Sequence, residues 1–299
     1  MTRTAPEPAA PAVERPVEAD AAAVPALRDV PGPTALGGGR RRSLELLYLI
    51  AVTDFKKHYL GTALGYAWSV ARPLLLFAVL LGVFTQVFRI GSDVPHYAVL
   101  LLLNLVLFGF FQEATTAAVG SIAAQENVVR KTQFPRLVIP LAVVATSVLN
   151  VALNLVVVLA FLLASGVTPR WTWLLFPVVF ALLLGLTTAV SLIVSTLYPR
   201  FRDTAIIWSV LSTILFYGSP VLYPLEKVPG AMRDALMLNP LSPVLELARK
   251  WIVDPGAPGP AALAGGGLRL LPALAIYVGL CAFAAWFFRR EAPRIAEEL

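Results

Sequence analysis

The 299-residue chain is 58% hydrophobic and only 14% charged, and its formal net charge at pH 7 is +6. A soluble domain has about 25% charged residues because its surface must stay hydrated. This composition therefore excludes a soluble enzyme, a secreted disulfide scaffold and a disordered chain. With one cysteine and two histidines, an intrachain disulfide is impossible and a zinc site is not indicated. The composition predicts an all-α, polytopic membrane protein.

The first part of the chain differs from the rest. Residues 1–39 are rich in Ala and Pro, carry three Arg against five Asp and Glu, and end in three glycines. We expect a disordered cytoplasmic tail, because this segment has too little apolar surface to fold and has no signal-peptide core. The transmembrane domain is predicted to cover residues 40–299. It begins with residues 43–59, whose apolar body is interrupted by four charged residues and favours an amphipathic helix in the membrane interface.

Long runs with almost no charge follow this helix. A helix needs about 20 apolar residues to cross the hydrocarbon core. Six membrane-spanning helices are therefore predicted, at about residues 64–88, 97–120, 138–164, 172–197, 205–224 and 268–288. Between the last two, residues 225–255 contain helix-length pieces broken by Pro229, Pro240 and Pro243. We expect short re-entrant periplasmic helices there, with an ordinary extracellular loop as the alternative.

The distribution of Lys and Arg predicts the orientation. With both termini in the cytoplasm, 14 of the 24 basic residues flank the spans on the cytoplasmic side and 7 lie in the outer loops. The net charge of +6 is therefore interpreted as a sign of topology rather than as a nucleic-acid footprint.

Few residues suggest chemistry. No Lys follows a Gly, so the phosphate loop G-x-x-x-x-G-K-[ST] is missing, and we expect no catalytic, cofactor-binding or metal-ligating residues. Ionisable residues inside spans are costly and often functional, and here the candidates are Arg72 and Glu113. Glu113 could be a proton site, although a hydrogen bond between helices or a contact with a partner subunit is favoured. Asn104, Asn150 and Asn154 could line a path or join helices.

Three motifs flank the spans. The first is Tyr59-x-Gly61-Thr62-x-Leu64-Gly65-x-x-Trp68-x-x-x-x-Pro73-Leu74; its glycines allow a bend into the first span, and its Trp suits the headgroup level. The second is Asn127-Val128-Val129-Arg130-Lys131-x-x-Phe134-Pro135-Arg136-Leu137-x-x-Pro140-Leu141, a basic segment that a soluble partner could grip. The third contains Arg202-Asp203, Ser219-Pro220-Val221-x-Tyr223, Val228-Pro229 and Asn239-Pro240-Leu241, and ends at Arg249.

In order and spacing, the three motifs resemble the membrane-spanning permease subunit of bacterial ABC polysaccharide exporters, the O-antigen and teichoic-acid export family, over about residues 40–290. The resemblance implies a homodimer of six-span subunits in the bacterial cytoplasmic (inner) membrane. It implies two copies of a separate ABC ATPase, which would bind the ATP and Mg, and a lipid-linked polysaccharide as cargo. It implies no cofactor in this chain and no nucleic-acid partner.

The resemblance also implies where the ATPase binds. In the family, the segment between spans two and three is a coupling helix, here at about 121–136, and the helix before span one lies at the same interface. The residues expected to couple to the ATPase are Gln125, Glu126, Asn127, Arg130, Lys131, Phe134, Pro135 and Arg136.

Spans one and five of two subunits are expected, from the same resemblance, to form the conduit. A glycan needs a wet path with aromatic rings that stack on sugar faces. The candidates are Tyr66, Trp68, Phe77, Phe84, Trp208, Phe216, Tyr217 and Tyr223. Aromatic residues at span ends also form interface belts, and Phe residues within spans face lipid or pack, so both interpretations stay open.

Two other functions stay open as well. One is a related ABC permease that exports a drug, a lipid or a peptide; the other is an ATP-independent carrier or channel. A carbohydrate-binding extension on the partner ATPase would favour the glycan, whereas stable activity without any ATPase would favour the carrier.

Overall fold

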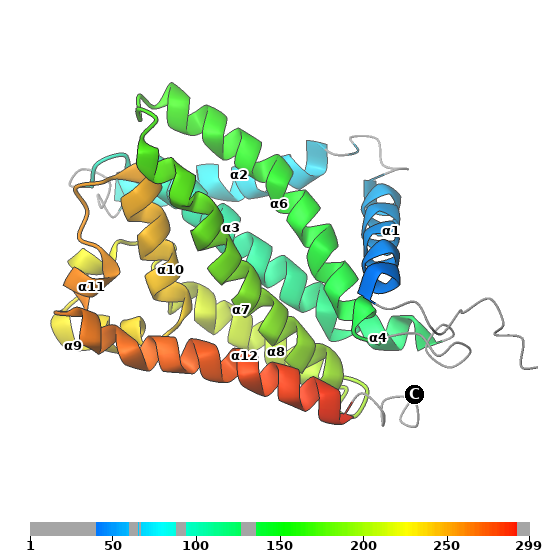
Figure 1. The fold of residues 1–299 in the computed structure, drawn as a ribbon. Helices are drawn as coiled ribbons and strands as arrows, with labels where there is room; N and C mark the ends of the chain where they lie inside the picture. Colours follow the sequence, from blue (N-terminus) through cyan, green and yellow to red (C-terminus); the bar gives the residue numbers. More distant parts are fainter. Residues whose placement is uncertain (1–39, 60–64, 66, 88–93, 127–135, 292–299) are drawn as a thin grey trace, which may run out of the picture. The chain divides into compact units, whose positions relative to one another are not determined.

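The computed structural model of the chain describes residues 40–59, 65, 67–87, 94–126 and 136–291. The tail predicted at 1–39 lies outside these ranges. All regular elements within them are helices (Figure 1). In chain order these are α1 (Arg40–Tyr59), α2 (Ala67–Gly82), η1 (Val83–Val87), α3 (Tyr97–Val119), α4 (Ser121–Ala124), α6 (Val138–Ala164), η3 (Trp171–Leu175), α7 (Phe176–Leu197), α8 (Thr204–Tyr217), η4 (Leu225–Lys227), α9 (Gly230–Met237), α10 (Leu241–Ala248), η5 (Arg249–Val253), α11 (Pro260–Leu263), η6 (Gly267–Leu270) and α12 (Leu271–Glu291).

Five of the six expected spans are long and apolar enough to cross a membrane. They are Ala67–Val87, Tyr97–Val119, Val138–Ala164, Trp171–Leu197 and Gly267–Glu291. They agree with the expected ranges to within a few residues, because charge-free runs of this length leave little choice of boundary.

The sixth expected span, 205–224, is wrong at its C-terminal end. Helix α8 stops at Tyr217, and its 14 residues reach only about 21 Å, less than the hydrocarbon thickness. Pro220 lacks an N–H group and disfavours helical geometry in the residue before it. A Cβ on Gly218 would lie 2.9 Å from the Ile214 carbonyl oxygen, so glycine fits this close turn. The six-span count stays a prediction.

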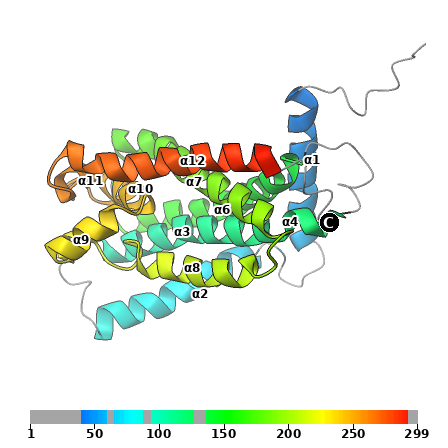
Figure 2. The ribbon, with the colours of Figure 1, turned by 90° about the horizontal axis from the view of Figure 1, so that it is seen from below.

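Helix α3 forms the centre of the helix packing. Most of its residues are buried, and it contacts α2, α6, α7 and α8; Figure 2 shows it between α6 and α8. A helix that is apolar all round belongs in the interior. Helix α2 is the opposite case, because Phe77 is its only buried residue.

Helix α1 packs across the first part of α6, where Thr146 Oγ1 donates a hydrogen bond to the Ala51 carbonyl, 3.3 Å away. This single helix covers the whole expected interfacial segment 43–59. Its exposed residues include Tyr48 and Lys56. A location at the membrane interface stays a prediction for this helix.

The expected short helices between the last two spans are present as α9 and α10. Pro229 and Pro240 directly precede them. Pro243 was expected to break a helix and does not; it lies in the first turn of α10, where its missing N–H group costs little. Re-entry into the membrane at 225–255 stays a prediction.

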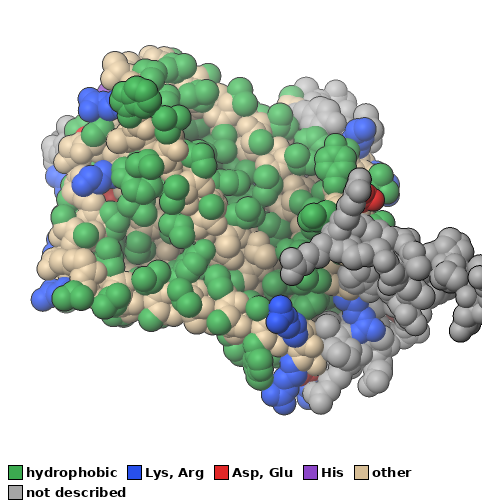
Figure 3. Space-filling model, in the orientation of Figure 1, with side chains coloured by type: hydrophobic (Ala, Val, Ile, Leu, Met, Phe, Trp, Pro, Cys, Tyr) green, Lys and Arg blue, Asp and Glu red, His purple; other side chains and the backbone are tan. Residues whose placement is uncertain are grey.

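Much of the surface of the described helices is apolar. Figure 3 shows hydrophobic side chains over the broad middle of one face, with Lys and Arg towards the two ends. Large side chains such as Val156 and Ile206 are 65% and 68% exposed. So much apolar surface is unstable in water and is stabilised by lipid, and the chain is therefore an integral membrane protein.

Candidate functional site

Residues 218–224, which follow α8, have no regular structure but are tightly held. Asn104 Nδ2 of α3 donates a 2.8 Å hydrogen bond to the Pro220 carbonyl, and Tyr97 Oη donates a 2.7 Å bond to the Leu222 carbonyl. Unpaired backbone groups inside a membrane cost several kcal/mol each, so irregular backbone needs such partners. Two polar side chains of the central helix therefore fix this loop.

Asn239 holds the same loop from the other side. Its Nδ2 atom donates to the Gly218 carbonyl at 3.1 Å and to Ser219 Oγ at 2.8 Å. Its Oδ1 atom accepts from the Leu241 N–H at 3.1 Å and so supports the start of α10. The Ser219-Pro220 and Asn239-Pro240 parts of the third motif therefore form one structural unit.

A buried ion cluster lies beside this loop. Arg249 Nη2 donates to Glu226 Oε1 at 2.8 Å, Arg249 Nη1 lies 3.7 Å from Glu246 Oε2, and Glu246 Oε1 accepts from the Leu225 N–H at 3.1 Å. Arg249 and Glu246 are each only 2% exposed. Burial raises the pKa of the Glu246 carboxyl. The hydrogen bond from the Leu225 N–H and the charge of the Arg249 guanidinium act in the opposite direction and lower this pKa. The motif predicted Arg249 but missed both acids.

The turn that contains Arg249 is also held by the start of the fourth span. Thr172 Oγ1 donates to the Trp251 carbonyl, and Trp173 Nε1 donates to the Ile252 carbonyl at 3.0 Å. The two acceptors lie in the π-helical turn η5. The loop, α10 and η5 are thus fastened to both α3 and η3 by side chains that bond to backbone carbonyls.

Four of the candidate conduit residues pack within the chain. Trp208 Nε1 donates to Thr115 Oγ1 at 3.2 Å. The Phe77 ring meets Phe161 edge-on with centroids 5.5 Å apart. The third, Phe216, meets Phe108 in the same manner at 5.2 Å, and Phe84 is partly buried against the core.

Two other candidates, Trp68 and Tyr217, are exposed, whereas Tyr223 packs partly against the core. Trp68 and Tyr217 are 52% and 63% exposed, and the partly buried Tyr223 donates through Oη to the Tyr217 carbonyl at 2.8 Å. Thr213 and Ser209 lie one and two turns before Tyr217, respectively, on the same exposed face of α8. This hydroxyl-bearing stripe was not among the expected site residues, although its i, i+4, i+8 spacing is visible in the sequence. A lining role for these residues, and for Tyr66 outside the described residues, stays a prediction.

The coupling segment is described only at its ends. Helix α4 is a single turn, Gln125 and Glu126 follow it partly buried, and Arg136 precedes α6. The other residues expected to couple lie outside the described residues, namely Asn127, Arg130, Lys131, Phe134 and Pro135. The coupling helix stays a prediction.

Glu113 of α3 accepts a hydrogen bond from Asn150 Nδ2 of α6, which confirms the favoured interhelical bond. Asn154 Nδ2 donates to the Asn150 carbonyl of its own helix at 3.1 Å. In the part of the chain that the structure describes, no three His, Cys, Asp or Glu residues cluster where they could hold a metal ion.

Residues 45–253 match the protein family described as "ABC-2 type transporter". An O-antigen export system permease protein RfbA of Klebsiella pneumoniae is 33% identical over 202 residues, which are 67% of this chain and 77% of that protein. One from Myxococcus xanthus is 32% identical over 206 residues, 69% of this chain and 78% of its own length. The polysialic acid transport protein KpsM of Escherichia coli is 25% identical over 214 residues, 71% of this chain and 81% of that protein.

Proposed function

The chain belongs to the ABC-2 type transporter family, and we propose that it is the permease subunit of an ATP-driven exporter of a lipid-linked cell-surface polysaccharide. The observation that carries this proposal is the similarity to O-antigen export permeases, at 32–33% identity over about two thirds of the chain. The similarity to a polysialic acid transport protein supports a glycan cargo rather than one particular glycan.

Transport requires partners. A separate ABC ATPase supplies the energy, since the chain lacks a phosphate loop, and it docks on residues 121–136 and on α1. Two copies of the chain face each other through α2 and α8. The exposed hydroxyl stripe Ser209, Thr213 and Tyr217 supports a wet path along α8, because hydroxyls exchange hydrogen bonds with sugars.

The packing suggests which helices move during transport. Helices α3 and α10, the loop 218–224 and the turns η3 and η5 are joined by the hydrogen bonds described above and form a rigid unit. Helix α2 has little buried surface, and α8 exposes a full face. We infer that ATP-driven motion of the coupling segment rocks α2 and α8 against this rigid unit, so that the glycan is threaded outward.

We place the chain in the bacterial inner membrane with both termini in the cytoplasm. Arg136, Arg200 and Arg289 lie at helix ends on the side of the bundle where α1 packs (Figures 1 and 2). The positive-inside rule makes this side cytoplasmic. Residues 225–255 then lie at the periplasmic end.

Depletion of the protein in its host tests the cargo. We expect a lipid-linked glycan to accumulate in the cytoplasmic leaflet, because synthesis continues without export; extraction and mass spectrometry of the lipid fraction would identify it. Re-expression of the chain is the control and should clear the accumulated material. If no glycan accumulates, the polysaccharide proposal is wrong and a drug, lipid or peptide cargo is favoured. If the purified chain transports without any ATPase, it is a carrier.

A further inference from the structure

Four exposed arginines lie at the end of the bundle that we place in the cytoplasm. Arg200 and Arg202 lie between α7 and α8, and Arg289 and Arg290 lie in the last turn of α12. The segment between α7 and α8 lies beside the C-terminal end of α12 in both views of the ribbon (Figures 1 and 2). Two parts of the chain that are far apart in sequence therefore contribute to one arginine patch.

The packing of α12 on α7 accounts for this proximity. Phe288 of α12 belongs to the same buried apolar cluster as Ala189 and Leu192 of α7. Helix α7 ends at Leu197, about 7–8 Å along the helix after Leu192. The arginines of α12 thus directly follow a contact with α7, and those after α7 follow it by about two turns.

The arginine patch has more positive charge than its own acids compensate. Within 200–203 and 289–291 the acidic residues are Asp203 and Glu291, so two of the four positive charges have no counterpart there. Arg290 Nε lies 3.8 Å from Glu291 Oε1. The other three arginines make no ion pair with any residue that the structure describes. An anion with two negative charges would balance the patch.

Two exposed aromatic rings hold guanidinium groups of the patch in place. Arg290 Cζ lies 5.2 Å from the centroid of the Trp286 ring, and Arg200 Cζ lies 5.4 Å from that of Phe201. These contacts position a guanidinium but leave its charge and its N–H donors available. Because Trp side chains gather at the level of the lipid headgroups, Trp286 places Arg290 at the depth of lipid phosphates.

A strip of small apolar residues on α12 leads away from the patch into the span. Ala275, Gly279 and Ala282 are all exposed and lie within about 60° of one another around the helix. Larger exposed side chains border the strip, with Val278 on one side and Phe283 on the other. A Cβ on Gly279 would meet nothing within 4 Å. The strip therefore has room for a lipid tail.

We propose that the arginine patch and the strip on α12 bind cardiolipin, a phospholipid that joins two phosphates in one headgroup. The guanidinium groups donate paired hydrogen bonds to phosphate oxygens, and an acyl chain lies along the strip. The two phosphates match the two uncompensated charges, and basic sites between helices at the cytoplasmic surface suit such a headgroup. The inference does not depend on the cargo and adds a lipid partner to the transporter.

The position of the patch argues against two other occupants. Helix α12 packs on α7 and η6 and lies on the opposite side of the bundle from α2 (Figures 1 and 2), so a lipid bound there is away from the proposed conduit at α2. The soluble ATPase could reach the arginines, but the strip lies within the membrane span Gly267–Glu291. Only a lipid contacts both.

Titration of the purified full-length chain with cardiolipin, followed by native mass spectrometry, tests the proposal. Phosphatidylglycerol, with one phosphate, is the second probe. We expect the wild type to bind cardiolipin more tightly than phosphatidylglycerol. Arg200→Leu and Arg289→Leu should each weaken cardiolipin binding by about fivefold, because each removes one positive charge at the lipid surface. Arg289→Lys, which keeps the charge, should retain most of the affinity.

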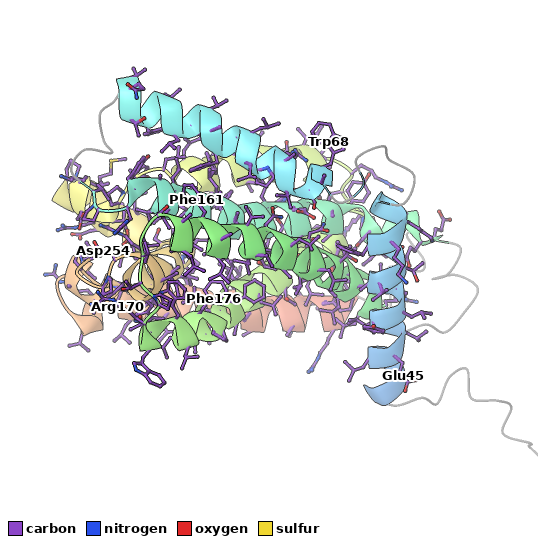
Figure 4. The ribbon with its side chains drawn as sticks, turned by 90° about the horizontal axis from the view of Figure 1, so that it is seen from above. Glu45, Trp68, Phe161, Arg170, Phe176 and Asp254 are labelled. Atoms are coloured by element: carbon purple, nitrogen blue, oxygen red, sulfur yellow. The ribbon has the colours of Figure 1, made fainter. Side chains whose placement is uncertain are left out.

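Arg170→Leu is the matched control. Arg170 is exposed and precedes the exposed Trp171, so it also combines a guanidinium with an indole, but Figure 4 shows it at the end of the bundle opposite α1. This variant should bind cardiolipin like the wild type. The unfolding temperature of all four variants without added lipid should match that of the wild type, since the substituted side chains are exposed.

Three results would overturn the proposal. Unchanged cardiolipin binding by both Arg200→Leu and Arg289→Leu would remove the site, and loss of the partner ATPase on purification of these variants would then assign the patch to the ATPase. An equal weakening by Arg170→Leu would show a general effect of charge. Equal affinity of the wild type for cardiolipin and phosphatidylglycerol would assign the patch to bulk anionic lipid. None of these results bears on the glycan cargo, which the depletion experiment tests separately.

Discussion

At the scale of single residues, the buried charge of Arg249 depends on two acids that the chain brings to it from different segments. Glu246 lies three residues away on the same helical stretch, but Glu226 lies 23 positions earlier and meets Arg249 only in the folded chain. A sequence pattern identified Arg249 and could suggest its i, i+3 neighbour. It could not predict Glu226, because nothing local indicates which distant carboxylate reaches a guanidinium.

Removal of Arg249 should therefore destabilise the protein strongly. We expect Arg249→Ala to cost about 3–5 kcal/mol, because Glu246 is left as an unpaired charge in a buried site. The double variant Arg249→Met with Glu246→Leu should recover most of this loss, since it removes the isolated charge. Thermal unfolding of the purified chain in detergent measures both effects. Arg269→Ala, which changes an exposed arginine of η6, is the control; a similar effect of Arg249→Ala and this control would contradict the prediction.

At the scale of elements, the spans were predictable and the loop between them was not. Charge-free runs set the bounds of α3, α6 and α7 to within a few residues, because hydrocarbon thickness fixes the length. The end of α8 differs from the expected bound because Gly218 and Pro220 stop the helix after Tyr217, although the charge-free run continues beyond it. The partners of loop 218–224 were beyond prediction, since Asn104 and Pro220 are separated by 116 positions. Buried polar side chains such as Asn104 suggested helix joining, but not what they join.

The packing of α7 on α12 gives a prediction at the same scale. A Cβ on Gly185 would clash with Tyr277 Oη, which donates a 3.0 Å hydrogen bond to the Leu182 carbonyl. We expect Gly185→Ala to lower the unfolding temperature, by displacing Tyr277 and losing about 1 kcal/mol of hydrogen bonding. In a Tyr277→Phe background the clash with the hydroxyl is absent, so the same substitution should be neutral or stabilising.

The control for the comparison of Gly185→Ala in the two backgrounds is Gly279→Ala in α12, where a Cβ would meet nothing within 4 Å. It should raise or leave unchanged the unfolding temperature, because alanine favours a helix over glycine by up to about 1 kcal/mol. If Gly185→Ala lowers stability equally in the wild type and in the Tyr277→Phe background, the hydroxyl contact is not the cause.

At the scale of the whole molecule, the outer faces of α8 and α12 should meet different surroundings. Both are exposed in the single chain, but α8 carries Ser209 and Thr213 one turn apart, whereas α12 exposes Leu274 and Val278. If two chains enclose a wet conduit along α8, only that face contacts water within the membrane. The apolar face of α12 fits contact with lipid tails.

Cysteine labelling would distinguish the two surfaces. In a Cys281→Ala background, we expect Ser209→Cys and Thr213→Cys to react with a membrane-impermeant thiol reagent, because a wet path admits both the reagent and the water that ionises the thiol. Val278→Cys, which replaces a residue inside α12 that is 56% exposed in the wild type, should react far more slowly. Labelling of the α8 positions should also block export of the glycan, since the adduct occupies its path. Equal reactivity at all three positions, or labelling of α8 without any effect on export, would contradict a conduit along this helix.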